Sequence, residues 1–143
     1  MNNEELIQLA IEARENAYAP YSHWRVGAAL LTADGKVYKG CNIENSAFTG
    51  TSCAERTAFF SAIAKGEMNF SKIAVVGGDE TQGIVDIVTP CGVCRQVMSE
   101  FCDPDKFKII CAKSLTEYKE YSLRDLLPDV NYVSANEGHG YKG

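Results

Sequence analysis

The sequence lacks the features that mark membrane-spanning, secreted and nucleic-acid-binding proteins. Its 143 residues contain no apolar run of the roughly 20 residues that a membrane-spanning helix needs. Residues 1–5 are acidic and have neither the basic start nor the apolar middle of a secretory signal peptide. No lysine- or arginine-rich run is present and the net charge is −5, which disfavours duplex DNA or RNA as a partner. We therefore expect a cytoplasmic protein without a membrane partner that acts on a small, neutral molecule.

Histidine is also scarce, whereas cysteine is plentiful. The two histidines, His23 and His139, have no ligand spacing to each other, so His23 receives no assigned role and His139 is expected at the surface. Six cysteines are present. Cytosolic thiols are mostly kept reduced, so a C-x-x-C pair in such a protein indicates metal binding or redox chemistry rather than a structural disulfide.

The composition is that of one ordinary globular domain. Apolar residues make up 45% and charged residues 23% of the chain, which is long enough to bury a hydrophobic core. No repeat, low-complexity tract or linker divides it, so residues 1–143 are expected to form a single domain. The tail from about residue 129 is polar and without periodicity, and we expect it to be loose or to contact a neighbouring subunit.

Hydrophobic periodicity predicts helices and strands in alternation. Helices are expected at 3–18, 53–65, 91–102 and 122–127. Strands are expected at 25–31, 37–42, 73–76, 107–112 and 117–122, with a hairpin turn at 34–35 and a long loop over 77–89. This order predicts an α/β fold with a mixed sheet covered by helices on both faces. The small residues at 27–29 indicate that another element approaches their strand closely.

Two stretches place cysteines where a helix is expected to begin. Cys53 opens one helix, and the motif Pro90-Cys91-x-x-Cys94 opens the next. Free N–H groups at a helix N-terminus favour negatively charged sulfur and lower the pKa of a thiol, which helps a metal ion to displace the protons. Three thiolates suit a zinc ion whose fourth position stays open for water.

Glu55, two residues after Cys53, has two interpretations. The pattern Ser52-Cys53-Ala54-Glu55 fits a capping box, in which the glutamate would reach back to the N–H of Ser52. Alternatively, Glu55 is the proton carrier of a hydrolytic zinc site, because zinc-bound water can have a pKa near ~7. The P-C-x-x-C motif downstream favours the second interpretation.

Two non-catalytic alternatives stay open for the cysteines. A fourth thiol from elsewhere in the chain would complete a closed zinc site that only holds the fold together. The spare thiols are those of Cys41, Cys102 and Cys111, which otherwise are interpreted as small buried apolar residues. In the second alternative, the C-x-x-C pair is a thioredoxin-like redox centre.

Three thiolates exceed the charge of one zinc ion, so nearby donors are expected to offset the excess and tune the metal. Arg56 and Arg95 follow the cysteines closely enough to do this, and Gln96 could donate a hydrogen bond to a thiolate. The alternative for both arginines is an exposed helix face, and for Arg95 the two interpretations weigh about equally.

These motifs resemble the zinc-dependent nucleoside and nucleobase deaminases, whose signature H-x-E…P-C-x-x-C is closely related to the C-A-E…P-C-x-x-C found here. More of the chain, from about Glu5 to Pro128, resembles the small cytidine deaminases in the order and spacing of its segments. Those segments are Ala19-Pro20-Tyr21-Ser22, Val26-Gly27-Ala28-Ala29, Gly40-Cys41-Asn42-Ile43-Glu44-Asn45, Cys53-Ala54-Glu55-Arg56-Thr57-Ala58 and Pro90-Cys91-Gly92-Val93-Cys94-Arg95-Gln96.

The resemblance implies a mixed five-stranded sheet sandwiched between helices, and a homotetramer in which each active site borrows groups from neighbouring subunits. It also implies residue roles. The zinc ligands would be Cys53, Cys91 and Cys94, the proton shuttle Glu55, and the thiolate-compensating arginine Arg56. The implied reaction is the zinc-dependent hydrolysis of cytidine and 2′-deoxycytidine to the uracil nucleosides and ammonia, a step of pyrimidine salvage.

Three further residues match substrate contacts of that family. The backbone N–H of Ala54 matches a contact to the pyrimidine carbonyl, and Asn42 with Glu44 matches a pair that hydrogen-bonds the ribose. Asn42 and Glu44 are two residues apart at a strand end, so both side chains can point to the same side. An amide and a carboxylate together supply the donors and acceptors that sugar hydroxyls need. Their alternative interpretation is turn chemistry after a strand.

The sequence departs from the family pattern at several positions. Trp24 stands where phenylalanine is frequent, and its indole could stack on the pyrimidine or pack over the edge of the core. Phe48 stands where tyrosine is common, in a loop expected to reach another subunit's site. After Pro128 the usual Gly-Ala-Phe is missing, and Tyr132 is a candidate replacement. The nearest alternative activity is therefore deamination of another aminopyrimidine, such as a nucleoside antibiotic.

Overall fold

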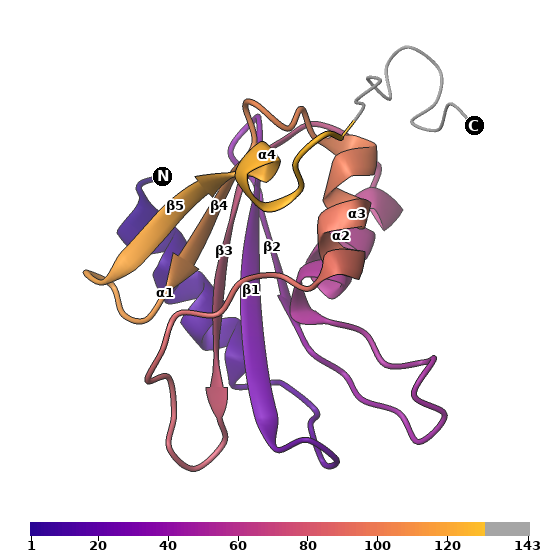
Figure 1. The fold of residues 1–143 in the computed structure, drawn as a ribbon, viewed down its shortest axis with the longest axis vertical. Coiled ribbons are helices and arrows are strands. Elements are labelled where there is room, and N and C mark those ends of the chain that lie inside the picture. Colours follow the sequence, from indigo (N-terminus) through magenta and orange to yellow (C-terminus); the bar gives the residue numbers. More distant parts are fainter. Residues whose placement is uncertain (131–143) are drawn as a thin grey trace.

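The computed structural model describes residues 1–130, so the expectations about Tyr132, His139 and the rest of the tail lie outside the described residues. The elements in chain order are α1 (Asn3–Arg14), β1 (Trp24–Thr32), β2 (Val37–Cys41), α2 (Ala54–Ala64), β3 (Phe70–Asp79), α3 (Gly92–Phe101), β4 (Lys108–Ala112), β5 (Tyr118–Ser122) and α4 (Leu123–Leu126) (Figure 1). None of the helices in this range is long and apolar enough to cross a membrane.

The strands form one mixed sheet in the order β2-β1-β3-β4-β5, which confirms the predicted fold class. Only β3 and β4 pair in parallel, while the other neighbours are antiparallel. Parallel neighbours need a long crossover, and α3 lies within it. Helix α1 covers one face of the sheet, and α2 and α3 cover the other (Figure 1).

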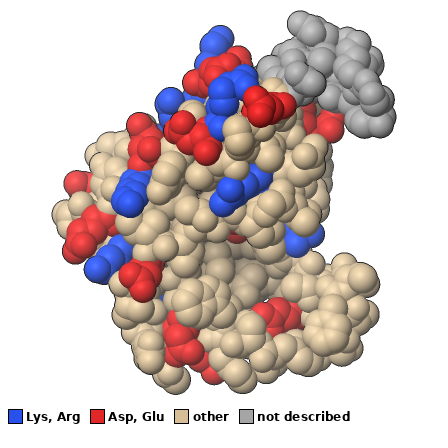
Figure 2. Space-filling view, viewed as in Figure 1, with Lys and Arg blue, Asp and Glu red and all other residues tan. Residues whose placement is uncertain are grey.

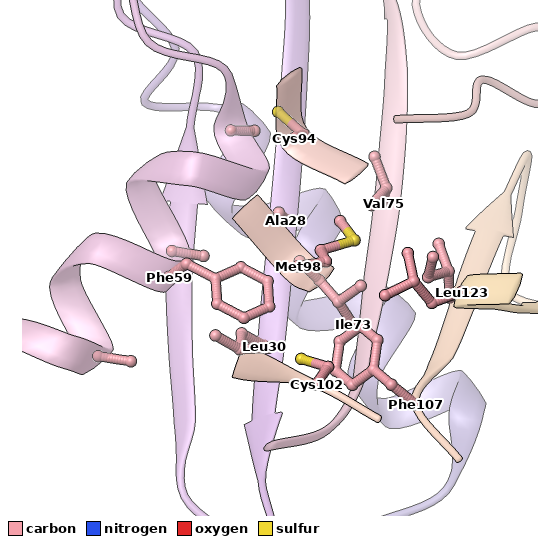
Figure 3. Packing of buried hydrophobic residues seen from close by; sticks show 14 of the residues in the cluster. Ala28, Leu30, Phe59, Ile73, Val75, Cys94, Met98, Cys102, Phe107 and Leu123 are labelled. Carbon is pink, nitrogen blue, oxygen red and sulfur yellow. The ribbon is translucent and has the colours of Figure 1, made fainter. Parts of the chain in front are cut away.

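The alternation of side chains along β1 and β3 divides the core between the two faces. Ala29 and Leu31 pack towards α1, whereas Ala28 and Leu30 pack towards α2 and α3. On the second face, Phe59 of α2 meets the side chains that α3 and the sheet contribute (Figure 3). Full burial of each large apolar side chain contributes about 1.5–3 kcal/mol, so this layer holds α2 and α3 in place on the sheet.

Two glycines let the helices approach the β1–β2 hairpin closely. A Cβ on Gly27 would lie 2.0 Å from the Ala10 carbonyl oxygen of α1, and a Cβ on Gly40 would lie 2.3 Å from the Ala54 carbonyl oxygen of α2. The close approach predicted for residues 27–29 is therefore that of α1. Gly40 performs the same role for α2, which carries part of the site described below.

Two predicted elements have wrong boundaries: α1 at its end and β3 at both ends, since β3 starts at Phe70 rather than at Ile73. Helix α1 ends at Arg14 rather than near residue 18, because Tyr18 leaves the helix to pair with Ile43, with its N–H donating to the Asn42 carbonyl. Strand β3 runs on to Asp79, although the two glycines after Val76 indicated a loop. The glycines are retained in the strand because they pair with β1.

Candidate active site

Three cysteine sulfurs come together where α2 and α3 begin. The sulfurs of Cys53, Cys91 and Cys94 all lie within 4.8 Å of one another. The Cys53–Cys91 distance is 3.6 Å and the Cys91–Cys94 distance is 3.5 Å. Thiolates bound tetrahedrally to zinc at ≈ 2.3 Å would be about 3.8 Å apart, so the trio fits this ion closely.

The helix starts explain how the sequence brings these sulfurs together. Cys53 is the N-cap of α2 and Cys91 is the N-cap of α3, both with extended backbone and neither with a side-chain capping hydrogen bond. Cys94 lies one turn into α3 and is buried. The free N–H groups and dipoles of two helices thus point at one place, which favours negative charge on sulfur.

Arg56 adds positive charge beside the trio. Its Nη2 donates to the sulfur of Cys53 at 3.3 Å. Hydrogen bonding from Cys94, together with the Arg56 guanidinium, lowers the pKa of Cys53 well below its ordinary value. The Nε of Arg56 is buried and has no hydrogen-bond partner among the described residues. Arg56 thus lies where the sequence placed a charge-compensating residue.

Glu55 lies in the first turn of α2 with 4% of its surface exposed. Burial is the main reason that the pKa of its carboxyl is raised to about 7, and the nearby Cys53 contributes to the rise. The capping-box interpretation is wrong, because the N–H of Ser52 donates to the Ile43 carbonyl and the N-cap of α2 is Cys53 rather than Ser52. The carboxyl is thus available beside the sulfurs rather than used by the backbone.

A pocket of about 320 Å³ opens in front of the cysteines and Glu55. This lies within the roughly 300–1,000 Å³ of small-molecule sites. Its lining combines apolar walls with polar groups: Ser22, Trp24, Val26, Asn42, Glu44, Thr51, Ser52, Cys53, Ala54, Glu55, Val75, Val88, Thr89 and Cys91. Figure 2 shows this face hollowed below the helices, with mostly uncharged residues around the hollow.

Asn42 and Glu44 both line the pocket, and both also hold its rim in place. The Asn42 side chain accepts from the Val26 N–H at 2.8 Å and donates to the Trp24 carbonyl at 2.8 Å. Glu44 accepts from the N–H groups of Tyr21 and Ser22 at 3.0 and 3.1 Å. The Ser22 hydroxyl donates to Glu44 and lowers the pKa of that carboxyl. Both interpretations of this pair, turn chemistry and ligand binding, are therefore compatible with one geometry.

The remaining predicted contacts divide into two groups. Trp24 and the fully buried Ala54 line the pocket. Phe48 does not line the pocket, because 73% of the surface of this residue is exposed to solvent. Its ring packs against that of Tyr21 in a T-shaped arrangement, with 6.3 Å between the ring centroids. Phe48 has φ 59°, a strained value for a bulky residue. Within one chain, Phe48 is a surface residue.

Two predicted neighbours of the sulfurs do not reach them. Gln96 is exposed on α3 and makes no hydrogen bond to a cysteine among the described residues, because two residues beyond Cys94 a side chain points to the other side of the helix. Arg95 turns away as well. Its guanidinium donates to the carbonyls of Pro90 and Leu126 at 2.7 Å, so it ties the start of α3 to α4.

Sequence reasoning missed several pocket residues. Ser22 and Val26 entered only as parts of family-like segments, and Val75, Val88 and Thr89 were not singled out. Val88 carried a usable signal, because Ile87 and Val88 are adjacent apolar residues in a stretch expected to be a loop. Adjacent apolar residues in a loop indicate burial, and here both pack against the core while Val88 also lines the pocket.

The two non-catalytic alternatives do not fit the described residues. The spare thiols Cys41, Cys102 and Cys111 are not in the sulfur group, so no fourth cysteine closes the site. All six cysteines are free, and Cys53 stands as close to Cys91 as Cys94 does. A redox pair does not require this third thiol.

Comparison with known proteins agrees with this site. Residues 1–111 match the family model of the cytidine and deoxycytidylate deaminase zinc-binding region. A curated cytidine deaminase from Sporosarcina psychrophila is 48% identical over 128 residues, 90% of this chain and 90% of that protein. Another, from Halalkalibacterium halodurans, is 45% identical over 128 residues, 90% of this chain and 92% of that protein.

Solved structures agree as well. The crystal structure of cytidine deaminase from Burkholderia pseudomallei has a TM-score of 0.82 and 46% identity to this chain, and the match covers 92% of this chain and 100% of that one. The sulfur trio, the sheet and the sequence all agree with the same assignment: this chain belongs to the cytidine and deoxycytidylate deaminase zinc-binding family.

Proposed function

We propose that this protein is a zinc-dependent cytidine deaminase, which hydrolyses cytidine and 2′-deoxycytidine to the uracil nucleosides with release of ammonia. The observation that carries the proposal is the position of buried Glu55 beside three converging cysteine sulfurs, with Glu55, Cys53 and Cys91 lining one pocket. Cys53, Cys91 and Cys94 would hold the ion. When bound, zinc supplies the Lewis acidity that makes water nucleophilic at neutral pH.

Glu55 carries the protons of the reaction. It takes one proton from the attacking water and delivers it to N3 of the ring, which makes C4 more electrophilic. Once the water oxygen is bonded to C4, Glu55 takes the second proton from that hydroxyl and passes it to the amine, so the C4 carbonyl forms, the carbon–nitrogen bond breaks and ammonia leaves. One buried carboxyl can serve as base and then as acid because its pKa lies near neutrality. The backbone N–H of Ala54 is the proposed contact to the ring carbonyl.

The rim of the pocket is proposed to bind the sugar. Asn42 retains one amide N–H and one oxygen lone pair beyond its two backbone contacts, and Glu44 is held as a charged acceptor by Tyr21 and Ser22. These groups can receive and donate hydrogen bonds to ribose hydroxyls. Trp24 supplies an aromatic wall on which a pyrimidine ring can stack.

We also propose that the working form is a homotetramer in the cytoplasm. Phe48 and Tyr21 are large aromatic residues exposed next to the pocket rim, and exposed apolar groups of this kind mark association surfaces. In this proposal the loop that carries Phe48 reaches a neighbouring subunit's site. Residence in the cytoplasm is supported by the six free thiols, three of which must stay reduced to bind metal.

The proposal is tested by a nucleoside panel combined with zinc analysis of the same samples. Cytidine, 2′-deoxycytidine, adenosine and an aminopyrimidine nucleoside antibiotic are incubated with protein of known zinc content, and ammonia release is measured. We expect one zinc per chain and turnover of cytidine and 2′-deoxycytidine. Turnover of the antibiotic alone would replace the proposed substrate, and zinc-loaded protein without any turnover would reject the enzyme.

Glu55→Gln is the matched variant, because it keeps the shape of the side chain and removes its acid–base function. We expect it to bind one zinc per chain and to lose at least about a hundredfold in kcat. Near wild-type turnover by the zinc-loaded variant would refute the role of Glu55.

A further inference from the structure

Gly77 of β3 lies directly behind one wall of the pocket. A Cβ on Gly77 would be 3.0 Å from Cγ2 of Val88, 3.3 Å from Nε1 of Trp24 and 3.3 Å from Cγ2 of Val26. All three of these residues line the pocket, whereas Gly77 itself does not. Contacts this short are tighter than a packed side chain tolerates without a shift of its neighbours. Because Gly77 has no side chain, the side chains of Val88, Trp24 and Val26 can pack directly against its backbone.

The backbone on the β1 side of this contact is held firmly. The Trp24 N–H donates to the Ser22 hydroxyl and the Trp24 carbonyl accepts from the Asn42 side chain. The Val26 N–H donates to the same Asn42 side chain, and Val26 is paired with Gly77 across the strands. A displacement at this position cannot be absorbed by sliding β1, so it passes into the side chains that face the pocket.

Buried Arg14 holds the same end of the two strands from the opposite face. Its Nε donates to the Arg25 carbonyl at 3.1 Å, and its Nη2 donates to the carbonyls of Gly78 and Asp79 at 2.9 and 3.0 Å. The strand ends that carry Trp24 and Gly77 are thus joined through three backbone oxygens. The indole of Trp24, attached through rotatable bonds, is the part of this assembly that can move.

We propose that Gly77 is a positioning residue that sets how far the Trp24 indole stands into the pocket, and so how much width is left for the pyrimidine ring. The proposal rests on the proposed function in taking that ring as the ligand. The adjacent Gly78 has a different role. The three atoms nearest to a Cβ there would be backbone atoms of Gly83 and Ile84, the closest being the Gly83 carbonyl oxygen at 2.1 Å, so Gly78 makes room for the backbone of the following loop.

Gly77→Ala tests the proposal, and Trp24 reports on it because it is the sole tryptophan of the sequence. Without any ligand, acrylamide quenching of tryptophan fluorescence measures the exposure of the indole. We expect stronger quenching in the variant, because the added methyl group pushes the indole off β3 into the pocket. Equal quenching in the wild type and the variant would overturn the proposal, whatever the protein turns over.

Kinetics and product binding give the functional half of the test. We expect Gly77→Ala to raise KM for cytidine about fivefold with kcat changed less than about twofold, because a narrower pocket weakens ground-state and transition-state binding alike. The dissociation constant of uridine, measured by quenching of Trp24, should rise by a similar factor. A lowered kcat at unchanged KM would contradict a positioning role in binding.

Trp24→Phe separates the indole from the other neighbours of Gly77. A phenyl ring lacks the five-membered ring whose nitrogen meets the added methyl group, so Gly77→Ala introduced into Trp24→Phe should change KM less than about twofold. Val88→Ala is the matched control, since it removes the shortest of the three contacts and leaves the indole in place. Rescue by Val88→Ala instead of Trp24→Phe would overturn the proposal.

If the Gly77→Ala single variant fails to fold, the double variant with Trp24→Phe still tests the proposal. Folding of the double variant with Trp24→Phe, monitored by circular dichroism, would support the contact between the indole and position 77. Failure of that double variant would locate the strain elsewhere and overturn the proposal.

Discussion

Helices α1 and α2 are nearly equal in length, 12 and 11 residues, and pack on opposite faces of the same hairpin over a glycine each. They begin differently. At α1 the Asn2 side chain accepts from the Glu5 N–H at 2.8 Å, a conventional N-cap. At α2 the N-cap is Cys53, and no side chain caps the helix.

The other two helices repeat the contrast. Helix α4 starts with a complete capping box from Ser122 and Asp125, while α3 has Cys91 as its N-cap and no side-chain capping hydrogen bond. The helices that only support the fold satisfy their first N–H groups locally. The two that begin at the site have no side-chain cap, so their N-terminal partial charges remain available to thiolates. The chain therefore gives up local helix stability at the positions where it builds the site.

Cys53→Ser is the change that should break this contrast most strongly. Serine is a good N-cap but a poor zinc ligand, so we expect zinc binding to weaken beyond detection and turnover to fall at least about a thousandfold. The metal-free variant should at the same time be about 1 kcal/mol more stable than metal-free wild type. Zinc analysis, ammonia release and thermal unfolding in chelator check the three parts.

Cys41→Ser is the control for Cys53→Ser. Cys41 is partly buried, as Cys53 is, but its sulfur is outside the trio. We expect this variant to keep its zinc and its turnover. Full zinc content in Cys53→Ser, or a metal-free form much less stable than metal-free wild type, would contradict the idea that Cys53 serves metal binding at the expense of helix capping.

Gly27→Ala and Gly40→Ala compare the two helices through their packing. Each added Cβ would meet helix backbone at 2.0 to 2.5 Å, so each variant should lose about 3 kcal/mol or more in free energy of unfolding. Only Gly40→Ala pushes on the helix that carries Glu55, so only it should lower kcat per folded molecule. Thermal unfolding with kinetics normalised to zinc content decides this, and equal kcat values would show that α2 adjusts without moving its carboxyl.

Arg56→Gln tests how the uncapped start of α2 handles its negative charge. The variant keeps a hydrogen-bond donor but removes the positive charge that lies 3.3 Å from the Cys53 sulfur. We expect it to retain zinc and to lose about 10- to 100-fold in turnover, because uncompensated thiolates make the ion less electrophilic. Unchanged turnover in the zinc-loaded variant would mean that the helix N-termini alone balance the sulfurs.

The sequence predicted most of the fold, and it failed where tertiary contacts overrode local pattern. Strands β1, β2, β4 and β5 were predicted to within two residues because they are short segments bounded by turn and loop residues, and β1 and β4 are continuous apolar runs. The end of α1 was wrong because Tyr18 pairs with a distant strand end. Gly77 and Gly78 were interpreted as a loop, since their place in β3 depends on β1 and Arg14 rather than on propensity. The strand order likewise depends on contacts that no local pattern encodes.

The site divides in the same way. The cysteines and Glu55 were predictable because their spacing sets helix positions, and Arg56 follows by one further turn from Cys53. Gln96 was misplaced because nearness in sequence was taken for nearness in space. The pocket walls and the space behind Trp24 come from segments far apart in the chain, so they could be found only in three dimensions.

Asn2→Ala is the smallest of the expected effects, and it tests the capped side of the comparison. Loss of the side-chain oxygen that accepts from the Glu5 N–H should lower the free energy of unfolding by about 1 kcal/mol. For a chain of this size that corresponds to a fall of about 2–4 °C in Tm. Because α1 packs on the face opposite the pocket, kcat, KM and zinc content should stay at their wild-type values. Asn2→Asp, which restores an accepting oxygen and adds a charge favourable to the helix dipole, should recover the lost stability. A change in kcat in Asn2→Ala would show that the start of α1 is coupled to the site through the sheet, and the division between supporting and site-forming helices would then be wrong.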